Sequence, residues 1–214
     1  MQDIIVGSFT LFIALIVSLV FYGNAEPRWF RVFTWFMLAK VFTKVSAYVY
    51  WRFTGKSDHF ILNTFILIEY GFYAFFCYKA VVMPVYKQSI AIAAGLLTLS
   101  WIMLVPRDYF HYNSVERILG ILFSFFCCAI YIAELLITDE VIDFFTTPMF
   151  WIVTGIMFAN LGMFLYFSFF DYIIKNNLDS EGTFYIITEN LTDNVQFFFF
   201  IMAFLCKRIW KKTS

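Results

Sequence analysis

Two lysines, Lys40 and Lys44, stand four residues apart in a stretch of sequence that is otherwise strongly apolar. On a helix this spacing places both ammonium groups on one face. Inserting a charged side chain at the middle of a membrane costs about 2.5–3.5 kcal/mol on insertion scales. Such a residue is therefore normally found only where it has a buried partner or a function. The pair could neutralise buried carboxylates, or it could form part of a site for a ligand, an ion or a proton.

Polar side chains recur near the middle of other apolar segments of the chain. Glu69 lies at the centre of one segment, Asn160 at the centre of another, and Asp193 within the last. In lipid such groups face the interior of a bundle or a wet cavity. We expect one central polar region that binds a ligand and to which ten residues contribute: Lys40, Lys44, Tyr48, Glu69, Tyr73, Asn160, Glu189, Asp193, Asn194 and Gln196.

Two interpretations of this region stay open. In the first, one of the two lysines forms a dry salt bridge with Glu69 or Asp193, and the amides hydrogen-bond between helices. In the second, the same residues line a cavity that accepts a small-molecule ligand, an ion or a proton. One pair would satisfy a structural need, whereas the ionisable groups here come from several segments. Their number favours the cavity.

The composition indicates which elements must hold these residues. The chain is 62% hydrophobic and 14% charged, against roughly 45–50% and about 25% in an average soluble protein. A chain this apolar has lipid as its solvent, and we expect an all-α integral membrane protein. Because the formal net charge is zero, there is no basic field to attract nucleic acid. The lipid bilayer is the expected partner.

The apolar segments predict a single transmembrane domain over residues 1–214, a seven-transmembrane-helix bundle with short loops. The four prolines fall between the segments, where a ring that breaks the helical ladder belongs. The last segment is the weakest, because its first half is polar. The expected spans are 4–22, 31–51, 60–78, 89–105, 118–137, 149–170 and 184–206.

Lysine and arginine in the loops indicate the orientation, because basic residues gather on the cytoplasmic side. With the N-terminus outside, the inner loops hold Arg28, Arg31, Lys79, Lys87, Lys207, Arg208, Lys211 and Lys212. The outer loops then hold Arg52, Lys56, Arg107, Arg117 and Lys175. We therefore expect an N-out, C-in protein of the cell (inner) membrane.

No metal or cofactor site is expected. The chain has only two histidines, and its four cysteines lie in or beside apolar segments without a C-x-x-C pattern, so they are interpreted as small buried hydrophobes. Gly155, Ala159 and Gly162 form a stripe of small residues, which is typical of close helix packing.

Four classes of function are compatible with a small helical membrane protein. A retinal photoreceptor needs a Schiff-base lysine at the middle of its last span, and this last segment has no lysine before Lys207. A lipid-modifying intramembrane enzyme could use Glu69 with Asp193 as an acid–base pair, but neither G-x-S-x-G nor H-E-x-x-H occurs. A small-solute or proton-coupled transporter remains an alternative, although there is no proline within a span and no evident repeat. We favour a sensory or partner-binding module over an enzyme, with no residue assigned a catalytic role.

A family resemblance supports that interpretation. The stretch Phe150-Trp151-Ile152-Val153-Thr154-Gly155 through Asn160, then Phe164-Leu165-Tyr166-Phe167, and the ending Ala203-Phe204-Leu205-Cys206-Lys207-Arg208 carry it. They resemble the last two spans of small bacterial seven-helix membrane proteins that are often encoded beside sensor histidine kinases. The resemblance covers about the last 60 residues of the chain and implies signalling through a separate membrane or cytoplasmic protein. It assigns no role to any residue.

Overall fold

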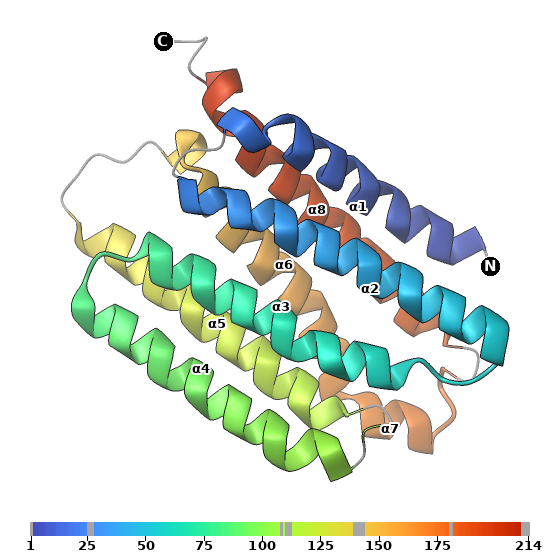
Figure 1. The fold of residues 1–214 in the computed structure, drawn as a ribbon. Coiled ribbons are helices and arrows are strands. Elements are labelled where there is room, and N and C mark those ends of the chain that lie inside the picture. Colours follow the sequence, from blue (N-terminus) through green and yellow to red (C-terminus); the bar gives the residue numbers. More distant parts are fainter. Residues whose placement is uncertain are drawn as a thin grey trace. The chain divides into compact units, whose positions relative to one another are not determined.

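A computed structural model describes residues 2–24, 28–107, 109, 113–138, 144–179 and 182–210 of the chain, and within them it contains helices and no strand (Figure 1). The α-helices are α1 (Gln2–Val20), α2 (Val32–Thr54), α3 (His59–Ala80), α4 (Pro84–Leu104), α5 (Ser114–Ile137), α6 (Pro148–Ser168), α7 (Phe170–Lys175) and α8 (Thr183–Trp210). The predicted all-α class is confirmed for the described residues.

Five helical segments in the described part of the chain are long and apolar enough to cross a membrane. They are Arg28–Thr54, His59–Ala80, Pro84–Leu104, Ser114–Ile137 and Pro148–Ser168. Such lengths match the hydrocarbon thickness of a bilayer, so the protein has multi-pass membrane character. The count of seven spans and the orientation stay predictions, because α1 and α8 are not among these five segments.

Several helix boundaries coincide with prolines in the sequence. Pro84 and Pro148 are the first residues of α4 and α6, where the missing N–H leaves no helical hydrogen bond unmade and the fixed φ suits the first turn. Pro106 lies in the turn that follows α4, and Pro27 lies outside the described residues. Helix α4 therefore starts five residues before the predicted span 89–105.

The described chain forms two compact units, one built from residues 1–34 and 135–214 and the other from residues 35–134. The single domain predicted from the sequence stays a prediction. In the first unit, α1 and α6 pack against α8. Gly155 and Gly162 lie against α8: a Cβ at Gly162 would stand 2.3 Å from Cγ2 of Thr192. The close packing predicted from the small-residue stripe is confirmed at these two glycines.

In the second unit, α3 and α5 run in the same direction. Helix α4, which connects them in the sequence, runs in the opposite direction. Arg117 lies opposite Glu69, and Gly120 lies under the ring of Tyr70, so residue numbers rise together along the two helices. The indole N–H of Trp101 on α4 donates to the carbonyl of Asn63 at 2.9 Å. We call the contact between α3 and α5 the α3–α5 seam.

Asp179 closes the start of α8. Its Oδ1 accepts the backbone N–H of Phe184 and its Oδ2 that of Tyr185, both at 2.9 Å. The hydroxyl of Tyr166 donates to Oδ2 at 3.4 Å. A carboxylate in this position accepts hydrogen bonds from the first backbone N–H groups of the helix, which have no partner within the helix. Its negative charge also interacts favourably with the positive end of the helix dipole. Asp179 therefore contributes to the position of α8 against α6.

Replacing Asp179 with asparagine is expected to lower the stability at neutral pH and to weaken its dependence on acid. Burial alone would raise the pKa of Asp179, but hydrogen bonds from Phe184 and Tyr185 outweigh it and hold the pKa below its ordinary value. The stabilisation is therefore complete above the unfolded-state pKa of about 3.9 and is lost as the pH falls through the lower folded-state pKa. Unfolding midpoints in detergent, measured from neutral pH to below about pH 3.9, test this expectation.

Asp58 supplies the matched control. It is the residue before the first turn of α3, yet its side chain makes no capping hydrogen bond. Asp58→Asn should leave both the midpoint and its acid dependence close to those of the parent. Equal acid slopes for Asp179→Asn and the parent chain would show that the cap contributes nothing to the pH dependence.

Candidate polar site in the second unit

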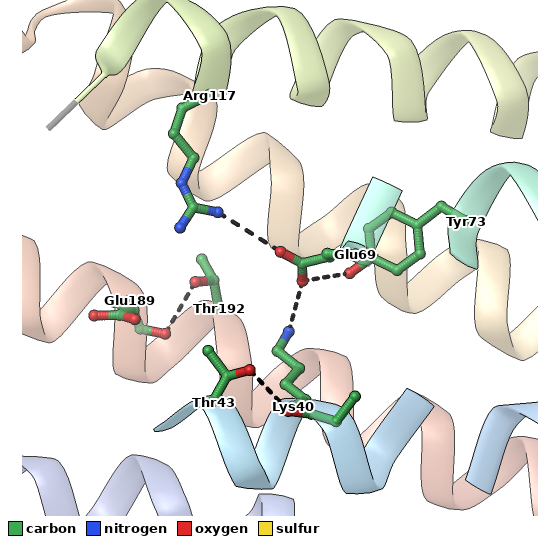
Figure 2. Close-up of polar contacts among 8 residues, drawn as sticks. Lys40, Thr43, Glu69, Tyr73, Arg117, Glu189 and Thr192 are labelled. Carbon is green, nitrogen blue, oxygen red and sulfur yellow. Dashed lines mark hydrogen bonds and ion pairs between the residues drawn. The ribbon is translucent and has the colours of Figure 1, made fainter. Parts of the chain in front are cut away.

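One carboxylate, that of Glu69, lies at the centre of a charged cluster (Figure 2). Its Oε1 accepts a hydrogen bond from Nζ of Lys40 at 2.9 Å and another from the hydroxyl of Tyr73 at 2.9 Å. Its Oε2 lies 3.6 Å from Nη1 of Arg117, which is ion-pair distance. Both oxygens of Glu69 thus face a cation. We call these four residues the Glu69 cluster.

Three helices position the Glu69 cluster. Lys40 lies in the third turn of α2, Arg117 lies in the first turn of α5, and α3 supplies both Glu69 and Tyr73. Glu69 and Tyr73 are four residues apart, so their side chains share one face of α3 and meet. The local sequence therefore fixes the Glu69–Tyr73 contact, whereas the contacts with α2 and α5 depend on how the helices pack.

The Glu69 cluster is buried. The side chains of Lys40 and Glu69 are only 8% and 11% exposed, and that of Arg117 is 18% exposed. Burial removes water from both charges of an ion pair, and this desolvation can exceed their attraction unless further hydrogen bonds satisfy the carboxylate. Tyr73 and Arg117 supply such contacts. The arrangement holds a full negative charge inside the protein, and loss of either nearest partner should be costly.

The structure identifies which carboxylate pairs with Lys40. Lys40 pairs with Glu69, and the hydroxyl of Tyr73 donates to the same carboxylate. Lys44 is half-buried one turn further along α2. Tyr48 does not belong to the buried region: it is 40% exposed, and its ring centroid lies 6.4 Å from that of Trp51. Eight residues separate it from Lys40, which turns it about 80° round the helix axis.

The other predicted polar residues belong to the first unit, on α6 and α8. Asn160 and Gln196 are buried, and the side chains of Glu189 and Asp193 are half-buried. Asn194 accepts a hydrogen bond from the hydroxyl of Thr10 on α1 at 2.5 Å. Of these residues, Asn194 thus makes a contact within the first unit, and the single shared site predicted from the sequence stays a prediction.

Arg117 was missed as a site residue, because the sequence pattern assigned it to an outer loop. Helix α5 instead begins at Ser114, four residues before the predicted span 118–137. Asn113 accepts the backbone N–H of Glu116 at 3.0 Å, which is the contact of a helix N-cap with the third helical residue. The order Asn-x-x-Glu resembles a capping box, and this signal could have placed Arg117 on the helix.

Two further buried carboxylates of α5, those of Glu116 and Glu134, accept hydrogen bonds from α4 and from the turn before it. Glu116 is fully buried and accepts a hydrogen bond from the hydroxyl of Ser100 at 3.2 Å. At the other end of α5, Glu134 accepts the backbone N–H groups of Val82 at 2.8 Å and Met83 at 2.7 Å. These N–H groups precede α4, so Glu134 holds the α3–α4 turn against α5. Both carboxylates contribute to the packing of the second unit.

The chemistry of the Glu69 cluster is that of charge and proton transfer. In the described part of the chain, no group of three or more histidine, cysteine, aspartate or glutamate side chains is arranged to hold a metal ion. A buried carboxylate between an ammonium and a guanidinium can exchange a proton, release a cation to a competing anion, or remain a fixed pair. Comparison with protein-family models, with curated proteins and with solved structures gives no match to this chain.

Proposed function

We propose that this chain is a multi-pass module of the cell's inner membrane that senses a signal or binds a partner, and that passes the response to a separate membrane or cytoplasmic protein. Seven spans with the N-terminus outside and the C-terminus inside are part of the proposal. They are supported by the basic residues of the inner loops, of which Lys211 and Lys212 lie outside the described residues.

The observation that carries the proposal is the contact of the Glu69 carboxylate with cations from two other helices. Lys40 of α2 binds one oxygen and Arg117 of α5 approaches the other. A pair that only neutralised Lys40 would need no contact with α5. Because Glu69 joins α2, α3 and α5, a change in its charge or in one of its partners alters how all three helices are held. A switch in the membrane needs an element of this kind, in which a small local event biases the packing of several helices.

Transport is the second candidate, and the same carboxylate supports it. Ionisable residues inside membrane helices mark proton relays and ion pathways in pumps and transporters. If Glu69 accepts and releases a proton during a transport cycle, its salt bridges with Lys40 and Arg117 would break and reform. This mechanism predicts flux across the membrane, whereas the sensory module predicts an interaction that responds to the state of Glu69.

A crosslinking experiment separates the candidates. The chain carries a photoactivated crosslinking residue in place of Val85, whose side chain is exposed near the start of α4, and is produced in the organism that encodes it. We expect one discrete crosslinked protein, and Glu69→Gln should change its yield several-fold while the amount of membrane-inserted chain stays constant. Glu116→Gln changes a second buried carboxylate of the same unit, which contacts Ser100 at the other end of α4, and it should weaken packing without changing the yield per folded chain.

Proteoliposomes that contain a pH-sensitive dye provide the second measurement. A pH change that depends on the protein and vanishes in Glu69→Gln, together with equal crosslinking yields, would replace the sensory proposal with transport. Equal yields without any proton flux would leave the Glu69 cluster a structural salt bridge and overturn the proposal.

A further inference from the structure

Three of the four cysteines of the chain meet in the second unit. The side chain of Cys77 on α3 lies beside those of Cys127 and Cys128 on α5. All three residues are almost completely buried, and none is in a disulfide. Cysteines scattered as small apolar residues need not meet. Here residues 50 positions apart are brought within reach of one another.

The register of the α3–α5 seam places these thiols together independently. Arg117 contacts Glu69 and Gly120 contacts Tyr70 further toward the start of both helices. Cys77 lies seven residues, or about two helical turns, beyond Tyr70, and Cys127 lies seven residues beyond Gly120. Because the two helices are parallel, moving seven residues along each helix from the Tyr70–Gly120 contact leads to Cys77 and Cys127. At the far end, Glu134 of α5 binds the N–H of Val82 just after α3.

We propose that Cys77, Cys127 and Cys128 form a redox-active thiol site, at which Cys77 forms a disulfide with one of the two thiols of α5. The oxidant is a lipid-soluble two-electron acceptor of the quinone class. The three thiols are buried and lie on two apolar helices of membrane-spanning length, so the oxidant has to be one that dissolves in the bilayer. A quinone dissolves in the same phase as the helices.

The reaction balances without leaving a charge in the bilayer. Two thiols lose two protons and two electrons and form one S–S bond, and the quinone takes up both protons and both electrons to become a hydroquinone. Reactants and products are neutral, which matters because an isolated charge in an apolar medium is strongly unfavourable. No further co-reactant is needed.

Helix geometry assigns Cys77 as the common partner. Cys127 and Cys128 are neighbours on one helix, so their side chains diverge by about 100° round the axis. A disulfide needs Cβ atoms about 3.5–4.5 Å apart and a dihedral angle near 90°, which is unfavourable between adjacent residues of a helix. Cys77 approaches both from the other helix. The disulfide would therefore tie α3 to α5 covalently, along the same seam that Glu69 and Arg117 join through charge.

The test uses the complete chain in lipid nanodiscs with tetramethyl-1,4-benzoquinone. Every ring carbon of this quinone is substituted, so it oxidises thiols without adding to them. After exposure, the chain is denatured and its remaining thiols are alkylated and located by peptide mass spectrometry. We expect two of the four thiols to become resistant to alkylation until a reductant is added, and a peptide pair that links Cys77 to Cys127 or Cys128.

Matched variants make the result decisive. Cys206 is also fully buried but lies in the first unit, so Cys206→Ser should leave the oxidation unchanged. Cys77→Ser and Cys77→Ala should abolish it, and ferricyanide, which does not enter the bilayer, should not cause it. The proposal is overturned if all four thiols of the folded parent chain stay open to alkylation after quinone treatment. It is equally overturned if the disulfide joins Cys127 to Cys128 or joins two chains.

Discussion

Lys40→Met should lower the free energy of unfolding by about 3–5 kcal/mol, which is the usual cost of removing one partner from a buried ion pair. Methionine preserves the length of the side chain and its apolar contacts, so the loss reports the charge. Without Lys40, the Glu69 carboxylate stays buried and loses a hydrogen bond of 2.9 Å. Titration with a denaturing detergent, followed by far-UV circular dichroism, measures the change.

Two further variants separate charge from packing. Lys40→Arg keeps a cation that can reach Glu69 and should retain most of the stability. The double variant Lys40→Met/Glu69→Gln removes both charges, so it should recover much of the loss, because a buried pair replaced by neutral groups is often close to neutral in stability. A loss below about 1 kcal/mol for Lys40→Met would instead resemble an exposed pair and would contradict the burial described for the Glu69 cluster.

Gly120→Ala should destabilise the second unit by about 1–3 kcal/mol, the range observed when a packed core is overfilled. A Cβ at Gly120 would stand 1.9 Å from Cε2 of Tyr70 and 2.4 Å from its Cζ. Tyr70 is only 2% exposed and its ring meets that of Tyr73 at 5.8 Å. The ring therefore has to move within packed surroundings, and Tyr73 is also a donor to Glu69. The same detergent titration measures this effect.

Gly71 offers a control of opposite sign. It follows Tyr70 on α3, and a Cβ placed there meets nothing within 4 Å. Gly71→Ala should leave stability unchanged or raise it by up to about 1 kcal/mol, because glycine is less favourable than alanine within a helix. Adding Tyr70→Leu to Gly120→Ala should relieve the clash, so that the two changes together cost less than their separate costs predict. Additive costs would show that the ring does not limit the space at Gly120.

The position of the helices could be predicted from the sequence, because helix formation and partition into lipid depend on local composition. The predicted segments agree with the helix bounds to within about five residues, and the largest shifts are at the start of α4, the start of α5 and the end of α8. The first two come from capping signals at Pro84 and Asn113. The contact of Glu69 with Tyr73 is equally local, since one turn of helix joins the two residues.

The partners of Glu69 on other helices could not be predicted in the same way. Pairing between helices depends on the rotation of each helix about its axis and on the register between helices that are not adjacent in sequence. A run of apolar residues leaves both quantities open. For this reason the choice of Glu69 for Lys40, the recruitment of Arg117 and the exclusion of Tyr48 appear only in the tertiary structure.

The sequence by itself determined that this is a helical membrane protein with charges buried in apolar segments, because hydropathy and helical period are properties of neighbouring residues. Only the tertiary structure decided what those charges and thiols meet. The parallel register of α3 and α5 brings Arg117 to Glu69 and Gly120 to Tyr70, and it brings Cys127 and Cys128 to Cys77. These contacts join residues about 50 positions apart. The periodicity of a single apolar segment does not determine how that segment packs against another one so far away in the sequence.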